Sequence, residues 1–267
     1  MAKRKKIGLA LSSGGARGLA HIGVIKALEE HNIPIDYIAG TSIGAMIGGV
    51  YAFHKDINLI EKVFLETDLK RVIRMSSDVR LFSGGLLAGE RVKEFIKKTL
   101  KGCDDFKDLQ IHFTAVACDI KKGEEVDINS GLLIDAIRAS VSFPGVLRPV
   151  EIDGKTLIDG GVVNPVPADV ARRMGADIVI AVNLDEQKGI LHQNKSAGNN
   201  IYSNLIGAFR LLQRSLARHS SSSADIIITP AVRHITWNEF RNAKYLIQAG
   251  RQAVLAEINS IKNLIFK

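Results

Sequence analysis

The chain has 267 residues, of which 46% are hydrophobic and 24% charged. It can therefore bury a large core, and we expect most of it to be ordered. A surplus of Lys and Arg gives a net charge of +8, which favours anionic partners such as lipid headgroups or phosphorylated molecules. Aromatic residues make up only 6% and no nucleic-acid-binding motif is present, so we expect no nucleic-acid partner.

The first elements alternate between strand and helix. An apolar strand over Ile7 to Leu11 is followed by a glycine turn and an amphipathic helix, "LAHIGVIKALEE". A short strand around Tyr37 to Ala39 leads into "GTSIG" and a helix over Ile43 to Phe53. Helical patterns follow at Leu59 to Glu66 and Glu90 to Leu100. The insert between these two helices, which contains "FSGGLLAG", is a candidate cap over a site.

The rest of the chain continues the alternation. "IHFTAVACDI" and "EEVDI" predict strands, "GLLIDAIRAS" a helix, and the Asp153-Gly154 pair in "VEIDGKTLIDGG" a hairpin. "ADIVIAVNL" and "ADIIITP" predict two more strands, with a polar loop at 185–200 and a helix at 201–218 between them. A final helix is expected over 239–264. This alternation indicates an α/β protein whose mainly parallel sheet is covered on both faces.

We divide the chain into three parts. Residues 1–6 are a basic N-terminal tail, residues 7–184 a core, and residues 185–267 a loop, strand and helices packed on the same domain. The apolar run after the tail is too short for a signal peptide, so we expect a cytoplasmic protein. Two cysteines, Cys103 and Cys118, are too few for a disulfide framework, and no Cys/His cluster has metal-ligand spacing.

The helix predicted at 201–218 carries two different faces. One face is apolar, and the opposite face carries Arg210, Arg214 and Arg218. We expect the apolar face to pack on the sheet and the arginines to face water. Peripheral contact of this helix with an anionic membrane, with the basic N-terminus as a second contact, is the alternative. The apolar positions are Ile201, Leu205, Phe209, Leu212 and Leu216.

The stretch "GTSIG", Gly40 to Gly44, fits a nucleophile elbow, in which Ser42 is projected from a tight turn between a strand and a helix. Gly44 and Gly48 would let the helix lie close to the sheet. The uncharged run from Tyr37 to His54 also resembles a membrane helix with small residues at its interface. The preceding strand, however, leaves too few residues to span a bilayer.

The stretch "SSGGARG" forms a second glycine turn between a strand and a helix. Its exposed backbone N–H groups could form an oxyanion hole, which stabilises negative charge on a carbonyl oxygen in a transition state. Arg17 could brace the loop through a salt bridge. The candidate residues of this oxyanion loop are Gly14, Gly15, Ala16 and Arg17, with Gly18 in support.

Two other interpretations of this turn stay open. A dinucleotide phosphate loop would place its glycine pattern on Ser13, Gly15 and Gly18, so its first glycine is missing, and Asp36 would serve as the ribose ligand. A nucleotide-binding oxidoreductase is therefore one alternative function. The other interpretation is a plain tight turn.

Asp159 stands at the end of an apolar strand, before the Gly160-Gly161 turn in "LIDGGVVNPVP". A carboxylate so placed can approach Ser42 and act as general base, provided that its surroundings raise its basicity. An Asp-Gly-Gly sequence taken alone is usually only a turn. A catalytic triad would instead need a histidine after Asp159, and the candidates are His192, His219 and His234.

Taken together, the glycine loop, the "GTSIG" elbow and the "DGG" turn resemble bacterial patatin-like phospholipases, as do "LAHIGVIKALEE" and "SFPGVLRPV". The resemblance covers about residues 7–184. It implies a patatin-type three-layer α/β/α fold with a mainly parallel central sheet. It also implies hydrolysis of lipid acyl esters by a Ser-Asp dyad, without histidine, metal or organic cofactor.

Carried onto this sequence, the resemblance makes Ser42 the nucleophile and Asp159 the general base, with Gly14 to Arg17 as the oxyanion loop. Ser12 and Ser13 depart from the family pattern, because glycines are common at these positions. A loop distorted there would lower the rate. A non-catalytic lipid-binding regulator, which keeps the pocket without turnover, is the second alternative function.

Overall fold

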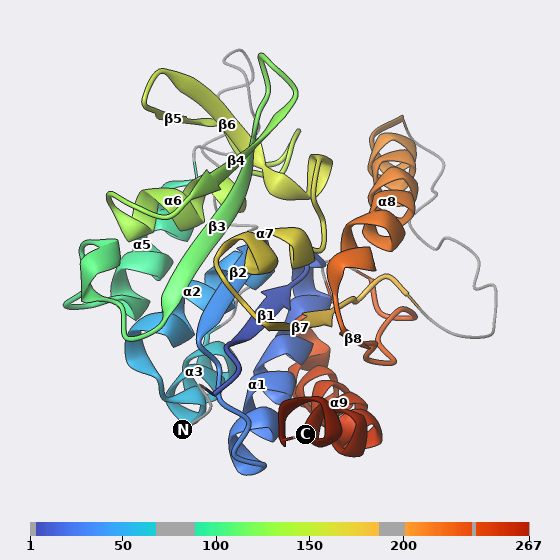
Figure 1. Cartoon of the computed structure of the whole chain (residues 1–267). Coiled ribbons are helices and arrows are strands. Elements are labelled where there is room, and N and C mark those ends of the chain that lie inside the picture. Colours follow the sequence, from blue (N-terminus) through green and yellow to red (C-terminus); the bar gives the residue numbers. More distant parts are fainter. Residues whose placement is uncertain (1–3, 68–88, 187–200, 237–238, 267) are drawn as a thin grey trace.

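The computed structural model describes residues 4–67, 89–186, 201–236 and 239–266 of the chain (Figure 1). Over these ranges, one sheet comprises β1 (Ile7–Leu11), β2 (Tyr37–Thr41), β3 (His112–Asp119), β4 (Glu124–Ile128), β5 (Val150–Ile152), β6 (Lys155–Asp159), β7 (Ile178–Val182) and β8 (Ile226–Ile228). The helices are α1 (Ala20–Glu30), α2 (Ile43–His54), α3 (Ile57–Glu66), α5 (Glu90–Thr99), α6 (Leu133–Ser140), α7 (Ala168–Arg173), α8 (Ile201–Ser220) and α9 (Ala243–Phe266). The candidate cap and most of the 185–200 loop lie outside the described residues.

The sheet is mainly parallel and has helices on both faces (Figure 1). Its order is β5-β6-β3-β2-β1-β7-β8, and β4 also pairs with β3. The strands β3, β2, β1, β7 and β8 are parallel to one another. The pairs β3–β4, β3–β6 and β5–β6 are antiparallel. The buried strand β1 alternates between faces. Ile7, Leu9 and Leu11 belong to the larger core beneath α1 and α2, and Ala10 belongs to a smaller core beneath α7. The expected three-layer α/β/α class is confirmed.

The strands β2 and β6 meet end to end along one edge of β3. β4 pairs with β3 over 115–119 and therefore occupies the other edge. On the shared edge, β2 ends where Thr41 pairs with Val116, and β6 ends where Asp159 pairs with the next residue, Ala117. This register brings the last residue of β6 beside the turn that follows β2.

The C-terminal segment extends the same sheet and core. β8 pairs with β7 in parallel. The long helix α9 packs along α1, and its residues Leu246, Ile247 and Val254 are buried in the larger core. A short 3-10 turn at Phe240–Asn242 precedes α9, so the helix begins a few residues later than the sequence pattern indicates.

The helix α8 is amphipathic as expected, but its inward face is mixed, because Gln213 is buried there together with Ile206 and Ala217. Leu205 and Leu212 are 64% and 65% exposed, whereas Gln213 is buried and Arg210 is largely buried. The expectation that the apolar face packs on the sheet is therefore wrong for Leu205 and Leu212, and Arg210 does not face water, whereas Arg218 is exposed as expected. Arg210 and Gln213 line the pocket of the candidate site, which explains why these polar side chains face inward.

Candidate active site

Ser42 lies in the sharp turn between β2 and α2. Its φ of 58° is in the left-handed region, which is strained for a residue with a side chain and is used by nucleophile elbows to project that side chain. The Ser42 N–H donates to Ser140 Oγ at 2.9 Å, and that hydroxyl donates to the carbonyl of Val116 at 2.6 Å. The helix α6 therefore holds the turn in place through Ser140.

The helix α2 begins directly against the end of β1. A Cβ atom at Gly44 would lie only 2.2 Å from the carbonyl oxygen of Leu11, so glycine is required for this approach. The expectation that Gly44 lets the helix lie close to the sheet is confirmed. Gly40, two residues before Ser42, packs in the same way against the first turn of α2. These contacts fix where the serine hydroxyl emerges.

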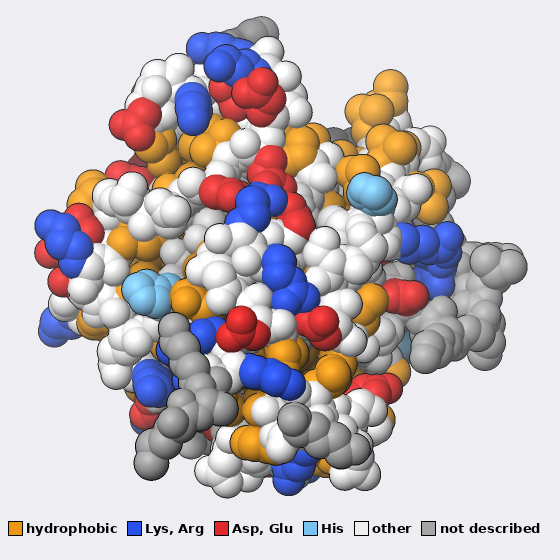
Figure 2. Space-filling model, in the orientation of Figure 1, with side chains coloured by type: hydrophobic (Ala, Val, Ile, Leu, Met, Phe, Trp, Pro, Cys, Tyr) orange, Lys and Arg blue, Asp and Glu red, His pale blue; other side chains and the backbone are white. Residues whose placement is uncertain are grey.

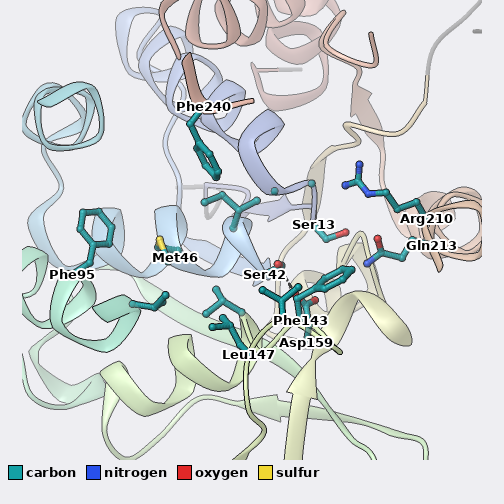
Figure 3. Close-up of a pocket in the computed structure, with 16 residues that line it drawn as sticks. Ser13, Ser42, Met46, Phe95, Phe143, Leu147, Asp159, Arg210, Gln213 and Phe240 are labelled. Carbon is teal, nitrogen blue, oxygen red and sulfur yellow. Dashed lines mark hydrogen bonds between the residues drawn. The ribbon is translucent and has the colours of Figure 1, made fainter. Parts of the chain in front are cut away.

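Asp159 faces Ser42 across the junction of β6 and β2 (Figure 3). The Ser42 hydroxyl donates to Asp159 Oδ2 at 2.5 Å, and the Gly161 N–H donates to Oδ1 at 2.8 Å. The backbone N–H of Asp159 donates to the carbonyl of Ser142 at 3.0 Å. Both carboxylate oxygens are thus held in place, and one of them accepts directly from the candidate nucleophile. Gly160 continues the turn and is buried.

The carboxyl group of Asp159 is only 1% exposed. Burial raises its pKa to about 6, while the hydrogen bonds from Ser42 and Gly161 act in the opposite direction. Asp159 is therefore ionised at neutral pH but more basic than an ordinary aspartate, whose pKa is ~3.9. A base in this range is suited to take a proton from a hydroxyl group near pH 7.

The glycine loop lies beside Ser42 and joins β1 to α1. Gly15 has a φ of 60°, which side chains disfavour, and it opens a 3-10 turn over Gly15–Leu19 that contains the buried Ala16 and Gly18. The first N–H groups of a helical segment have no acceptor within that segment. Gly14 and Gly15 line the same pocket as Ser42. The predicted oxyanion loop is thus beside the candidate nucleophile.

Serine at positions 12 and 13 is compatible with this loop. Neither Ser12 nor Ser13 has a positive φ. The Ser13 N–H donates to the carbonyl of Pro165 at 2.9 Å, and Nε2 of His21 donates to the carbonyl of Ser12 at 2.8 Å. Burial lowers the pKa of His21 to about 4, so this imidazole is neutral and has a structural role.

Arg17 braces the loop from within the protein. Its side chain is buried, forms a salt bridge of 2.7 Å with Asp185, and donates to the carbonyls of Gly14 and Leu184 at 3.3 and 3.4 Å. Leu184 and Asp185 follow β7, so Arg17 ties the loop to the neighbouring strand. The proposed bracing salt bridge is confirmed.

A pocket opens above Ser42, Asp159 and the glycine loop (Figure 3). Its described polar side chains are few: Ser13, Ser42, Asp159, Arg210 and Gln213. Apolar side chains from α2, from α5, from the segment that follows α6 and from the turn before α9 form the remaining wall. They are Ile43, Met46, Val92, Phe95, Val141, Phe143, Val146, Leu147 and Phe240.

The histidines proposed for a triad are not at this pocket in the part of the chain that is described. His219 is exposed near the end of α8, and the ring of His234 contacts Tyr245. His192 lies outside the described residues. Within the same ranges, no group of three His, Cys, Asp or Glu side chains is arranged to hold a metal ion.

Residues 9–172 match the family model described as patatin-like phospholipase. The chain belongs to the patatin-like phospholipase family. Among its relatives is an uncharacterized NTE family protein of Mycobacterium tuberculosis, 41% identical over 181 residues, which cover 67% of this chain and 49% of that protein. The lysophospholipase NTE1 of Pyricularia oryzae is 37% identical over 183 residues, 67% of this chain and 12% of the relative. This patatin-like chain thus spans about half or less of these relatives.

The fold of this patatin-like chain also resembles a solved structure. The type III effector protein ExoU aligns over 97% of this chain and 53% of its own, with a TM-score of 0.51 and 14% sequence identity. An identity this low supports the fold and nothing more.

Ser140 was expected from sequence to bind backbone groups or to line the site, and it binds the backbone of the elbow. Two other side chains of the patatin-like site were not predicted from sequence: Arg210 and Gln213 enter the pocket from α8. The sequence pattern does not indicate that Arg210 and Gln213 point inward, because an amphipathic helix with one polar face normally turns that face to water.

Proposed function

We propose that the protein is a serine acyl hydrolase that cleaves acyl esters of lipids, of the phospholipase A or lysophospholipase type. The observation that carries this proposal is the 2.5 Å hydrogen bond from Ser42 to a buried, basic carboxylate at the floor of an apolar pocket. Membership in the patatin-like phospholipase family and a relative named lysophospholipase support it.

In the proposed reaction, Asp159 takes the hydroxyl proton as Ser42 Oγ attacks the ester carbonyl carbon. The carbonyl oxygen becomes negatively charged and is stabilised by N–H groups of the loop from Gly14 to Arg17. The tetrahedral intermediate collapses, the carbon–oxygen bond to the alcohol breaks, and Asp159 returns the proton to the leaving alkoxide. Water, deprotonated by Asp159, then attacks the acyl carbon. The bond from this carbon to Ser42 Oγ breaks, Asp159 returns the proton to Oγ, and the fatty acid is released.

The walls of the pocket suit the acyl part of such a substrate. Met46 and Phe95 lie to one side of Ser42 in Figure 3, among other apolar side chains. An acyl chain bound there would leave water, and each buried CH₂ group would contribute about 0.8 kcal/mol. We therefore propose that this side of the pocket receives the chain.

Fatty-acid release from monoacyl lipid esters tests the proposed function. We expect turnover by the wild-type protein. Labelling of Ser42 by a fluorophosphonate probe without turnover of any acyl ester would contradict hydrolysis. Absence of both would favour the lipid-binding regulator.

The oxidoreductase alternative is disfavoured by the position of Asp36. This carboxylate binds Arg4, Lys6 and the N–H of Ile7, so it is not available to a ribose at the glycine loop. We expect NAD(P)H to cause no shift in thermal unfolding. A shift would revive that alternative.

The activity should depend on the ionisation of Asp159. Only the ionised carboxylate accepts a proton, and its pKa is raised to about 6. We therefore expect kcat/KM to be constant between pH 7 and 8 and to fall about tenfold per pH unit below pH 6. The measurement is a pH profile with a soluble ester. A profile that stays flat down to pH 4.5 would contradict the proposed role of Asp159.

We also propose that the protein acts peripherally at an anionic membrane through α8. None of the helices in the described ranges has the length and apolarity of a membrane-spanning segment. The outward face of α8 is nevertheless apolar, with Ile201, Leu205 and Leu212 each more than 60% exposed, and Figure 2 shows hydrophobic side chains gathered over this helix. The cytoplasmic location expected from sequence stays a prediction.

Charges beside this face favour anionic lipid. Arg214 is close enough to Arg218 and Arg233 for their charges to lower its pKa, after the larger effect of burial. Arg214 and Arg218 lie on α8 and Arg233 lies near them, so the helix carries cations as well as exposed apolar side chains, a combination typical of helices that lie in a membrane interface. Arg4 and Lys6 of the N-terminus instead pair with Asp36, so we assign the contact to α8.

The double variant Leu205→Gln/Leu212→Gln should bind phosphatidylglycerol vesicles at least about tenfold more weakly, because two apolar side chains no longer enter the interface. Phe266→Gln is the control: it is 66% exposed near the C-terminus, away from α8 in Figure 1, and should bind like wild type. Cosedimentation at low and high salt measures the effect. The assignment would be overturned if the wild-type protein bound phosphatidylcholine vesicles as well as phosphatidylglycerol vesicles. It would also be overturned if the wild-type protein formed a dimer that covers α8 and did not bind vesicles.

A further inference from the structure

The pocket has a polar end opposite its apolar end. Figure 3 shows Ser13, Arg210 and Gln213 together on one side of Ser42, with Met46 and Phe95 on the other. The nucleophile thus lies between a place for a hydrocarbon chain and a place for a polar group. The proposed mechanism uses none of the three polar side chains.

Arg210 brings a positive charge into this end. The charges of Arg17 and Asp185 act on its guanidinium group. Arg17 and Asp185 form a salt bridge with each other at 2.7 Å. Burial, followed by repulsion from Arg17, lowers the pKa of Arg210 to about 9. A bound anion would favour the charged form of Arg210, because burial and the nearby charge of Arg17 both disfavour it.

Ser13 and Gln213 add hydrogen-bonding groups beside this charge. The Ser13 hydroxyl is buried, lines the pocket and has no hydrogen-bond partner among the described residues. A buried hydroxyl without a partner is costly, so it indicates a ligand that satisfies it. The amide of Gln213 lies over the turn after Asp159, since a Cβ at Gly161 would come within 2.2 Å of its Nε2 atom.

From these observations we infer that Ser13, Arg210 and Gln213 bind the phosphate group carried on the same glycerol as the acyl ester in a phospholipid or lysophospholipid. The inference rests on the proposed acyl-ester hydrolysis and names the substrate feature that the site selects. A guanidinium donates two parallel hydrogen bonds to phosphate oxygens, and a hydroxyl and an amide can donate to the remaining ones. In the substrate, the reacting carbonyl stands between acyl chain and phosphate, as Ser42 stands between the two ends of the pocket.

The expected selectivity follows from this arrangement. A monoacylglycerol has the same acyl chain and ester as a lysophospholipid but offers no anion to Arg210. The enzyme should therefore prefer the phosphorylated ester. Ser13 gives this chain a hydroxyl where glycine is common in the family, so the polar end is partly a feature of this chain.

The test compares Arg210→Met with Lys262→Met, which removes an exposed cation on α9 that is not part of the pocket lining. Octanoyl lysophosphatidylglycerol and octanoyl monoacylglycerol serve as substrates. For Arg210→Met we expect kcat/KM on the phosphorylated ester to fall about 10- to 100-fold and that on monoacylglycerol to change less than threefold. Ser13→Ala should reduce the same selectivity by a smaller factor. Lys262→Met should leave both values near wild type.

An equal fall on both esters would mean a structural role for Arg210 and would overturn the inference, as would no change on either. A further experiment tests whether inorganic phosphate inhibits the hydrolysis of monoacylglycerol. If phosphate inhibits this hydrolysis through Arg210 while wild type shows no preference for the phosphorylated ester, the site binds free phosphate and the headgroup assignment is wrong.

A binding measurement separates this inference from the proposed function. Calorimetry with the Ser42→Ala protein should give tighter binding of the lysophospholipid than of the monoacylglycerol, and Arg210→Met in that background should abolish the difference. This result needs no turnover, so it stands even where hydrolysis is absent. Equal binding of both lipids would overturn the phosphate site while Ser42-dependent hydrolysis still supported the proposed function.

Discussion

Replacing Ser42 with alanine should lower kcat/KM for a lipid ester by about ten-thousandfold or more, because the atom that forms the acyl-enzyme is removed. Substrate binding should persist, since the pocket walls and the glycine loop are unchanged. Fatty-acid release measures the loss, and a thermal melt checks that the variant is folded. Loss of the Ser42 hydrogen bond should also raise the pKa of Asp159 further, because that bond now lowers it.

A matched control for this variant is Ser215→Ala, on the exposed side of α8. It removes the same hydroxyl group away from the pocket and should hydrolyse esters like wild type. If Ser42→Ala kept even a tenth of the wild-type activity, another nucleophile would have to act and the assignment of Ser42 would be wrong.

The variant Asp159→Asn should lose about a thousandfold in kcat/KM. Asparagine fits the same space: its oxygen can accept from the Gly161 N–H, and its amide then faces Ser42 as a donor. The serine proton would have no acceptor, although the packing is kept. Activity assays of the folded variant test this. Activity within tenfold of wild type would mean that Asp159 is not the base.

The same variant should be more stable than wild type at neutral pH. The folded pKa of Asp159, about 6, is above its unfolded value of ~3.9, so the folded state binds the proton more tightly. The contribution of Asp159 to the free energy of unfolding is therefore present below pH ~3.9 and is lost as the pH rises from there through about 6. At pH 8, asparagine should add on the order of 1 to 3 kcal/mol to the free energy of unfolding.

Thermal melts at two pH values check the sign. At pH 8 the melting temperature of Asp159→Asn should exceed that of wild type by several degrees. At pH 4 the gain should largely disappear, because the wild-type carboxyl group is then protonated and neutral in the folded state. A variant that is less stable at pH 8 would contradict the raised pKa.

Local patterns predicted the elbow well. The glycines around Ser42 and the strand and helix on either side of it are adjacent in sequence, so spacing alone indicates the turn. The hairpin at Asp153-Gly154 was also predicted, and both of its residues adopt positive φ. The short helix α7, Ala168–Arg173, was not expected, because its six residues are too few to show a helical period.

The approach of Asp159 to Ser42 has a different origin. It depends on β2 and β6 sharing one edge of β3, and the register of strands so distant in sequence leaves no local trace. The family resemblance supplied what the pattern of residues did not. The orientation of α8 was predicted wrongly because the pattern shows that the helix has two faces without showing which one the pocket requires.

We propose that Ser42 and Asp159 form a dyad that works without histidine. Mass spectrometry after reaction with a fluorophosphonate tests it most directly, with wild type, Asp159→Asn and a triple variant of His192, His219 and His234 to alanine. We expect one adduct, on the peptide that contains Ser42, in wild type and the triple variant, and almost none in Asp159→Asn. An adduct on another serine, or its loss in the triple variant, would contradict the dyad.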